Sequence, residues 1–267
     1  MPSTYYYVDG VPIHTFYTGS TFLPGSPLPR HRGRAVLFLH GAGSNGHVWQ
    51  EILRRLATHH SPVAIDLPAH GRSGGLLAAD SIAAYCEVVD QFLTVTQFAP
   101  CVLVGHSMGG AIAQSYALTH PNKLSGLVLS STGARLRVLP EVLQLWKDAS
   151  LGKPVQIYSR TAYSPTTAME IVRQGWAEQR KTDPRVRYGD FVACDRFDMM
   201  HRLQEITVPT LVLSGTDDVI TPPKYATYLQ QHIPGAQLTM LPNAGHMGYA
   251  EQPEAMANAL STFLAQL

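Results

Sequence analysis

The chain has 267 residues, enough for one large domain of strands and helices or for one domain that carries a sizeable insertion. Hydrophobic residues make up 45% and charged residues 15%, which is typical of a globular protein with a large core and a rather neutral surface. The net charge of +1 gives no electrostatic reason to bind nucleic acid or an anionic membrane, so we expect neither partner.

The cysteines and the first residues bear on the compartment. Cys86, Cys101 and Cys194 are odd in number, widely spaced and without a CxxC pair, which favours reduced core residues. Residues 1–7 show neither the basic nor the apolar region of a secretory signal, and no apolar run approaches 18 residues. We therefore expect a soluble, cytoplasmic protein.

Short apolar strands alternate with helices through the first half of the chain. Residues 5–17 predict a hairpin around Asp9-Gly10 at the edge of a sheet, followed by a proline-rich surface loop over 18–34. The later apolar runs predict strands, and the amphipathic stretches after them predict helices that open near Val48, Ser81 and Met108. These strands lie at 35–39, 62–65, 101–104 and 124–131.

The segment Gly105-His106-Ser107-Met108-Gly109 lies between the buried strand at 101–104 and an amphipathic helix. Glycines flank Ser107 because strand and helix approach too closely there for side chains, and the turn is strained. Such a turn lifts the hydroxyl out at the carboxyl end of a sheet, as a nucleophile requires. The motif alone leaves open a glycine-rich turn with a surface serine.

This placement resembles the nucleophile turn of the α/β-hydrolase family, and the resemblance continues along nearly the whole chain. The loop His40-Gly41-Ala42-Gly43-Ser44 follows the strand at 35–39. In the family, this loop gives one backbone N–H to the oxyanion hole, and the residue after the serine gives the other. The resemblance thus implies oxyanion donors at Ala42 and Met108. The alternative is a plain glycine turn into the helix that ends at Leu56.

The run Asp66-Leu67-Pro68-Ala69-His70-Gly71-Arg72-Ser73 resembles the family's Asp-x-Pro-Gly-x-Gly-x-Ser turn, with Ala69 where glycine is usual. We expect a structural role, in which hydrogen bonds to Asp66 hold the loop. A metal site built on Asp66 and His70 lacks further ligands at a useful spacing, so no metal is expected.

The strand–helix alternation breaks off over residues 133–205, where prolines interrupt helical stretches, and apolar strands resume at Val208. In this family such an insertion looks like a helical cap over the active site. We therefore divide the chain into a core of residues 1–132 and 206–267 and a cap of residues 133–205. Large apolar side chains of the cap could line an acyl pocket, although packing within the cap's own small core is favoured for each: Trp146, Tyr158, Tyr163, Trp176, Phe191, Phe197, Met199 and Met200.

Two further loops complete a set of catalytic candidates. The family commonly shows Gly-x-x-Asp after the strand that resumes the sheet, which selects Asp218 after Gly215 and leaves its neighbour Asp217 as the alternative acid. A glycine before His246, after the last predicted strand, resembles the family's histidine loop. The order Ser107, Asp218, His246 is the nucleophile–acid–base order of this fold.

The resemblance implies an α/β-hydrolase fold: a mostly parallel central sheet, helices on both faces and an inserted helical cap. It also implies hydrolysis of small to medium carboxylic esters through an acyl-enzyme, with no cofactor. Ser107 in place of aspartate excludes the branches that open epoxides or displace halides, and His106 departs from the Asn of many C–C bond hydrolases.

Other uses of the same residues remain open. They are C–C bond hydrolysis, acyl transfer, perhydrolysis and, because the cap carries Lys147, Lys153 and Lys181, a cyanohydrin-lyase variant. A non-catalytic small-molecule receptor is the alternative of another class. The sequence does not indicate an oligomeric state.

Overall fold

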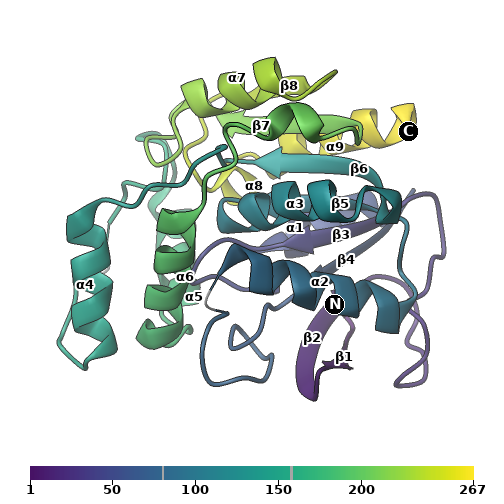
Figure 1. The fold of residues 1–267 in the computed structure, drawn as a ribbon, viewed down its shortest axis with the longest axis horizontal. Helices are drawn as coiled ribbons and strands as arrows, with labels where there is room; N and C mark the ends of the chain where they lie inside the picture. The colour runs from purple at the N-terminus through teal and green to yellow at the C-terminus, as the bar shows by residue number, and fades with distance from the viewer. Residues whose placement is uncertain (80, 157–158) are drawn as a thin grey trace.

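A single twisted sheet organises the protein (Figure 1). The computed structural model describes residues 1–79, 81–156 and 159–267, and within these ranges the sheet has eight strands in the order β1-β2-β4-β3-β5-β6-β7-β8. The strands from β4 to β8 run parallel, and β1 and β2 run antiparallel at one edge. Their bounds are β1 Ser3–Val8, β2 Val11–Tyr17, β3 Ala35–Leu39, β4 Ser61–Ile65, β5 Cys101–His106, β6 Leu124–Ser130, β7 Thr210–Gly215 and β8 Gln237–Leu241.

Helices cover both faces of the sheet, which is why β3, β4, β5 and β7 are buried along their whole length. One hydrophobic cluster lies beneath α2, α3 and α7, and the other lies beneath α1 and α9. Figure 1 shows α2 and α3 in front of the sheet. The helices are α1 Gln50–Leu56, α2 Ile82–Thr96, α3 Met108–Thr119, α4 Pro140–Ser150, α5 Met169–Gln179, α6 Pro184–Arg196, α7 Pro223–His232, α8 Gly248–Glu251 and α9 Pro253–Gln266.

The elements predicted in the first half of the chain are present. The hairpin turns at Asp9 and Gly10, which have φ of 48° and 77°, and β1 forms the edge of the sheet. Ser81 caps α2 by accepting a hydrogen bond from Ala84 N at 3.2 Å. The three cysteines are free and buried, as predicted. Among the helices of the described ranges, none combines the length and apolar character needed to cross a bilayer.

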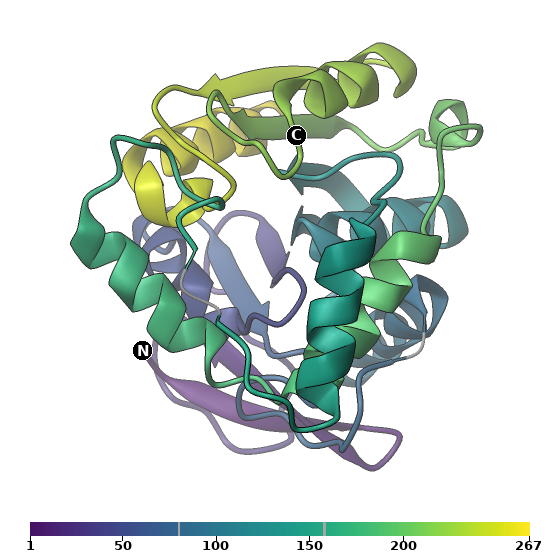
Figure 2. The ribbon, with the colours of Figure 1, turned by 90° about the vertical axis from the view of Figure 1, so that its left-hand side faces the viewer.

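Within the described residues, the α-helices α4, α5 and α6 lie between β6 and β7 in the chain and beyond one end of the sheet (Figure 1). Seen from that side, α4 and α6 run side by side, and α5 lies apart from them (Figure 2). Phe197 and Met199, which follow α6, do not pack in a separate small core. They belong to the main cluster beneath α2 and α3, because the end of α6 returns to the sheet. The predicted candidate Tyr158 lies outside the described residues.

Candidate active site

Ser107 occupies the tight turn between β5 and α3. Its φ of +53° and ψ of −115° are strained for a residue with a side chain. A β-carbon added to Gly109 would lie 2.6 Å from the carbonyl oxygen of Leu39, so the close approach of backbone requires glycine there. A β-carbon on Gly41 would lie 3.1 Å from Ser107 Cβ. The loop after β3 therefore lies directly beside the serine.

His246 follows β8 and is held by Asp218, which follows β7. His246 Nδ1 lies 2.9 Å from Asp218 Oδ2, and both side chains are buried. Asp218 Oδ1 accepts hydrogen bonds from Ile220 N and Thr221 N, each at 2.9 Å, and Oδ2 accepts one from Thr221 Oγ1 at 2.7 Å. Burial raises the pKa of Asp218, but the charge and hydrogen bond of His246 and these donors lower it to about 2. The ionised carboxylate only accepts, so Nδ1 carries the proton in neutral His246 and leaves a lone pair on Nε2.

The neighbouring carboxylate, Asp217, is engaged elsewhere. Its Oδ2 accepts a hydrogen bond from Ser164 Oγ at 2.6 Å, and Thr216 Oγ1 donates to its Oδ1 at 3.2 Å. The side chain is half-buried at the foot of the helical insertion. The structure therefore brings Asp218, and not the alternative Asp217, to the ring of His246.

Two further histidines support the loops around the serine. His106 Nε2 donates to the carbonyl oxygen of His246 at 2.9 Å. His40 Nδ1 donates to the carbonyl oxygen of Gly41 at 2.9 Å, and its Nε2 accepts from Leu67 N at 3.0 Å. Burial lowers the pKa of His106 to about 3 and that of His40 to about 4, so both are neutral near pH 7.

A cavity of about 1030 Å³ opens at the carboxyl ends of the strands, between the sheet and the helical insertion. Ser107, His246 and Ala42 line it. Of the large cap side chains predicted as pocket candidates, Trp146, Tyr163 and Phe191 line it, whereas four others that the structure describes do not: Trp176, Phe197, Met199 and Met200. The rest of the wall mixes aliphatic with charged side chains. The aliphatic ones include Val48, Val138, Leu139, Val142, Leu145 and Ile171, and the charged ones include Glu51, Arg54, Glu178 and Arg187.

Comparison with known proteins agrees with this architecture. The model of the alpha/beta hydrolase family matches residues 36–259. The chain belongs to the alpha/beta hydrolase family. It is 29% identical over 245 residues to a pimeloyl-[acyl-carrier protein] methyl ester esterase of Neisseria meningitidis, an alignment that covers 86% of this chain and 93% of that protein.

Solved structures of esterases superpose on this hydrolase over nearly its whole length. A thermophilic esterase is 32% identical, with a TM-score of 0.79, and the match covers 99% of this chain and 98% of that one. The esterase EaEST of Exiguobacterium antarcticum shares the fold, with a TM-score of 0.85 at 19% identity and coverage of 99% and 100%. The fold and the family predicted from the sequence are confirmed, and the esterase relatives support ester hydrolase activity.

In this hydrolase, the helical insertion holds the loop after β3, which the sequence did not predict. Gly43 N donates to Asp190 Oδ2 at 2.7 Å, and the carbonyl oxygen of Gly43 accepts from Arg187 Nη2 at 2.8 Å and from Thr182 Oγ1 at 2.9 Å. Asp190 and Gly43 are 147 residues apart. Asp190 lies in a segment without any recognisable motif, so no local sequence signal marks it.

The same insertion also holds the histidine loop of the hydrolase. His246 N donates to the carbonyl oxygen of Ala162 at 2.8 Å. Glu251 bridges the two segments, since Oε1 accepts from Ser164 N at 2.7 Å and Oε2 accepts from Gly245 N at 2.9 Å. A β-carbon on Gly245 would lie 2.7 Å from Ser164 N, which explains the glycine before the histidine.

Asp66, predicted to hold its loop, accepts hydrogen bonds from Gly46 N at 2.6 Å, Arg72 N at 2.9 Å and His14 Nδ1 at 2.9 Å. Its predicted alternative metal partner, His70, contacts a different carboxylate, that of Asp190. Across the described part of the chain, no group of three or more His, Cys, Asp or Glu side chains is placed to hold a metal ion.

Proposed function

We propose that this alpha/beta hydrolase is a serine esterase that cleaves carboxylic esters with a Ser107–Asp218–His246 triad. One observation carries the proposal. Asp218 accepts a hydrogen bond from Nδ1 of His246, which leaves the lone pair on Nε2. This lone pair is available in the cavity that His246 and Ser107 both line. The esterase relatives support the same reaction class.

In the proposed mechanism, Ser107 Oγ attacks the ester carbonyl carbon while His246 Nε2 takes the hydroxyl proton. The carbonyl oxygen becomes an oxyanion that accepts hydrogen bonds from Ala42 N and Met108 N. When the intermediate collapses, the C–O bond to the alcohol breaks, and His246 returns the proton to the departing oxygen. Water, activated by His246, then adds to the acyl-enzyme and releases the acid and free Ser107. These steps use only groups of this chain and water.

We also propose that residues 133–205 act as a cap over a core of residues 1–132 and 206–267. The position of α4, α5 and α6 over the end of the sheet supports this division, as do the cavity-lining residues Trp146, Tyr163 and Phe191. A roofed cavity favours small to medium esters that reach Ser107 as dissolved molecules. The Neisseria relative is named for a methyl ester, so esters of small alcohols are suitable first substrates.

The test is a series of p-nitrophenyl esters of increasing acyl length, assayed with the natural chain and with Ser107→Ala. We expect steady turnover that falls by about 10⁴- to 10⁶-fold in the variant, as for other triad nucleophiles. A fluorophosphonate probe should label the natural chain and not Ser107→Ala. More than about a tenth of the natural activity in Ser107→Ala would exclude the mechanism, since loss of a triad nucleophile leaves far less.

The same assay separates the alternatives that share these residues. A marked increase in rate with added alcohol or peroxide would indicate acyl transfer or perhydrolysis. A single slow turnover would indicate a small-molecule receptor that keeps the triad. Cleavage of a vinylogous diketone in preference to every ester would indicate a C–C bond hydrolase.

A further inference from the structure

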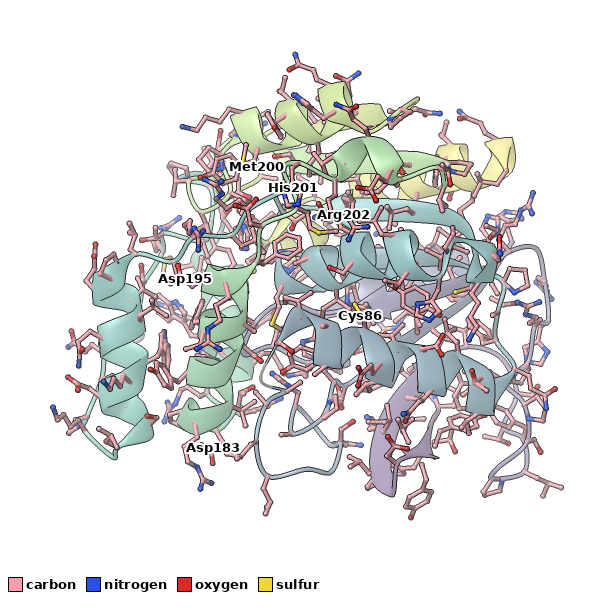
Figure 3. The ribbon with its side chains drawn as sticks, viewed as in Figure 1. Cys86, Asp183, Asp195, Met200, His201 and Arg202 are labelled. Carbon is pink, nitrogen blue, oxygen red and sulfur yellow. The ribbon has the colours of Figure 1, made fainter. Side chains whose placement is uncertain are left out.

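Asp190 is a buried carboxylate that joins the helical insertion to both the core and the loop beside Ser107. It lies in α6, between the two ends that Asp183 and Asp195 mark in Figure 3, and its side chain is wholly buried. Oδ2 accepts from Gly43 N and from His70 Nε2, each at 2.7 Å, and Oδ1 accepts from Tyr85 Oη at 2.6 Å. Three separate segments of the core therefore converge on one side chain.

The contact with His70 is a buried ion pair. His70 Nδ1 lies 2.9 Å from the carbonyl oxygen of Pro68, and Nε2 lies 2.7 Å from Asp190 Oδ2. The carbonyl oxygen of Pro68 and the ionised carboxylate of Asp190 accept hydrogen bonds only, so both ring nitrogens of His70 carry protons. Burial alone lowers the pKa of His70, but the charge of Asp190 and the two hydrogen bonds raise it overall. Burial likewise raises the pKa of Asp190, while His70, Tyr85 and Gly43 N lower it overall. The pair keeps the Asp190 carboxylate ionised and fixed in place.

Gly43 is the residue that this arrangement fixes. Asp190 binds its N–H, and Arg187 and Thr182 bind its carbonyl oxygen, so both of its flanking peptide groups are held from α6 and the turn before it. The guanidinium of Arg187 is itself clamped, with Cζ 4.5 Å from the centre of the Trp146 ring. Gly43 has φ of +62°, and a β-carbon there would collide with Arg187, so this position requires glycine.

We propose that Asp190, assisted by Arg187 and Thr182, is a positioning residue for the oxyanion hole, acting through Gly43 on the neighbouring N–H of Ala42. The inference rests on the proposed esterase function. An oxyanion hole works because its donors are already oriented when charge develops, and the loss of one donor costs about 10²- to 10³-fold in kcat. The acceptor that orients this loop comes from the insertion and not from the sheet that carries Ser107.

The variant Asp190→Leu removes the acceptor from Gly43 and keeps the branching of the side chain at Cγ, with two methyl groups in place of the two carboxylate oxygens. We expect kcat for p-nitrophenyl butyrate to fall by about 10- to 100-fold while KM stays within about threefold, because the donor acts on the transition state. A trifluoromethyl ketone tests the same donor directly. Ser107 Oγ adds to its carbonyl carbon, His246 takes the proton, and the ketone oxygen becomes an oxyanion. Its inhibition constant should rise by about the factor by which kcat falls, whereas that of the matching neutral alcohol should not change.

The conservative variant Asp190→Asn separates hydrogen bonding from charge. Its amide oxygen can take the place of Oδ2 and accept from Gly43 N, while its amide nitrogen faces Tyr85 Oη, which can accept. We expect Asp190→Asn to recover kcat to within about fivefold of the natural chain. Thr182→Val removes one donor to Gly43 and should reduce kcat and ketone affinity together, by a smaller factor. These two variants carry the test if Asp190→Leu does not fold.

Asp195→Asn is the matched control. Asp195 lies near the end of the same helix, and its Oδ1 accepts from Val138 N at 3.0 Å, outside the loop after β3 (Figure 3). Its kcat and ketone affinity should stay within about threefold of the natural values, since no oxyanion donor depends on it.

The inference is wrong if folded Asp190→Leu binds the trifluoromethyl ketone as tightly as the natural chain. It is also wrong if Asp190→Asn loses more than about fivefold in kcat, or if Thr182→Val changes neither kcat nor the affinity for the ketone. In each of these cases activity would still require Ser107. Activity that survives Ser107→Ala would instead overturn the proposed function itself.

Discussion

Asp218→Asn should prevent His246 from acting as the proposed general base, although the number of heavy atoms in the site stays the same. The amide oxygen must take the place of Oδ1, because Ile220 N and Thr221 N both donate to that atom. The amide nitrogen then takes the place of Oδ2, 2.9 Å from His246 Nδ1. It donates to Nδ1, so the single imidazole proton moves to Nε2. The proposed base then has no lone pair for the proton of Ser107.

The expected loss is about 10⁴-fold in kcat, or about 5.4 kcal/mol of transition-state stabilisation, as for the same change in another Ser-His-Asp triad. Steady-state hydrolysis of p-nitrophenyl butyrate measures it, with circular dichroism to verify the fold. Asp217→Asn is the control, and it should lose less than about tenfold because Asp217 binds Ser164 and not the imidazole. If Asp217→Asn lost more activity than Asp218→Asn, the tautomer argument would be refuted.

Three other outcomes test separate features. The kcat/KM for p-nitrophenyl esters should peak at roughly two to eight acyl carbons, without activation by emulsified triglyceride. The reason is that each methylene contributes about 0.8 kcal/mol only while the cavity buries it. A kcat/KM that still rises at sixteen carbons would contradict a fixed roof. Burial raises the pKa of Asp218, but His246 lowers it from 3.8 to about 2. The ionised Asp218 thus adds roughly 2 kcal/mol of stability that is complete above pH 4 and lost as the pH falls to 2. In urea unfolding from pH 7 to 2.5, the free energy of unfolding should therefore decline less for Asp218→Asn than for the natural chain. Ala69 has φ of +64°, which is strained for alanine but not for glycine. Ala69→Gly should therefore stabilise the protein by about 1 kcal/mol, seen as a rise in Tm. An unchanged or lower Tm would mean that the turn is not strained.

The features that the sequence predicts well are those with a local steric cause. The turn around Ser107 needs glycines because the backbone at the start of α3 approaches Gly105 and the backbone at the end of β3 approaches Gly109, and that need is visible as a motif. The choice of Asp218 has a different basis, because it comes from the resemblance to the family's Gly-x-x-Asp pattern; the structure brings this carboxylate to His246. Buried strands are visible because their apolar runs are continuous.

The helical insertion was far less predictable. Its helices form no repeating pattern with the sheet, and its key contacts join residues distant in the sequence. Asp190 meets Tyr85, His70 and Gly43 across 105, 120 and 147 residues, so only the folded chain shows the three partners together. Met199 could not be assigned to the main core, because its burial depends on how the end of α6 returns to the sheet.

The hydrogen bonds from residues 160–190 to the loop after β3 and to the loop that carries His246 limit how this protein can be recombined with its relatives. A chimera that kept the sheet and took its helices from another family member would gain new pocket walls. It would also lose the acceptor of Gly43 N and the acceptor of His246 N, which are Asp190 and the carbonyl oxygen of Ala162. Transplants that retain these two attachment points while changing the wall at Val142, Leu145 and Ile171 should exchange selectivity without disturbing turnover. The insertion is thus an interchangeable module only along its cavity-facing surface.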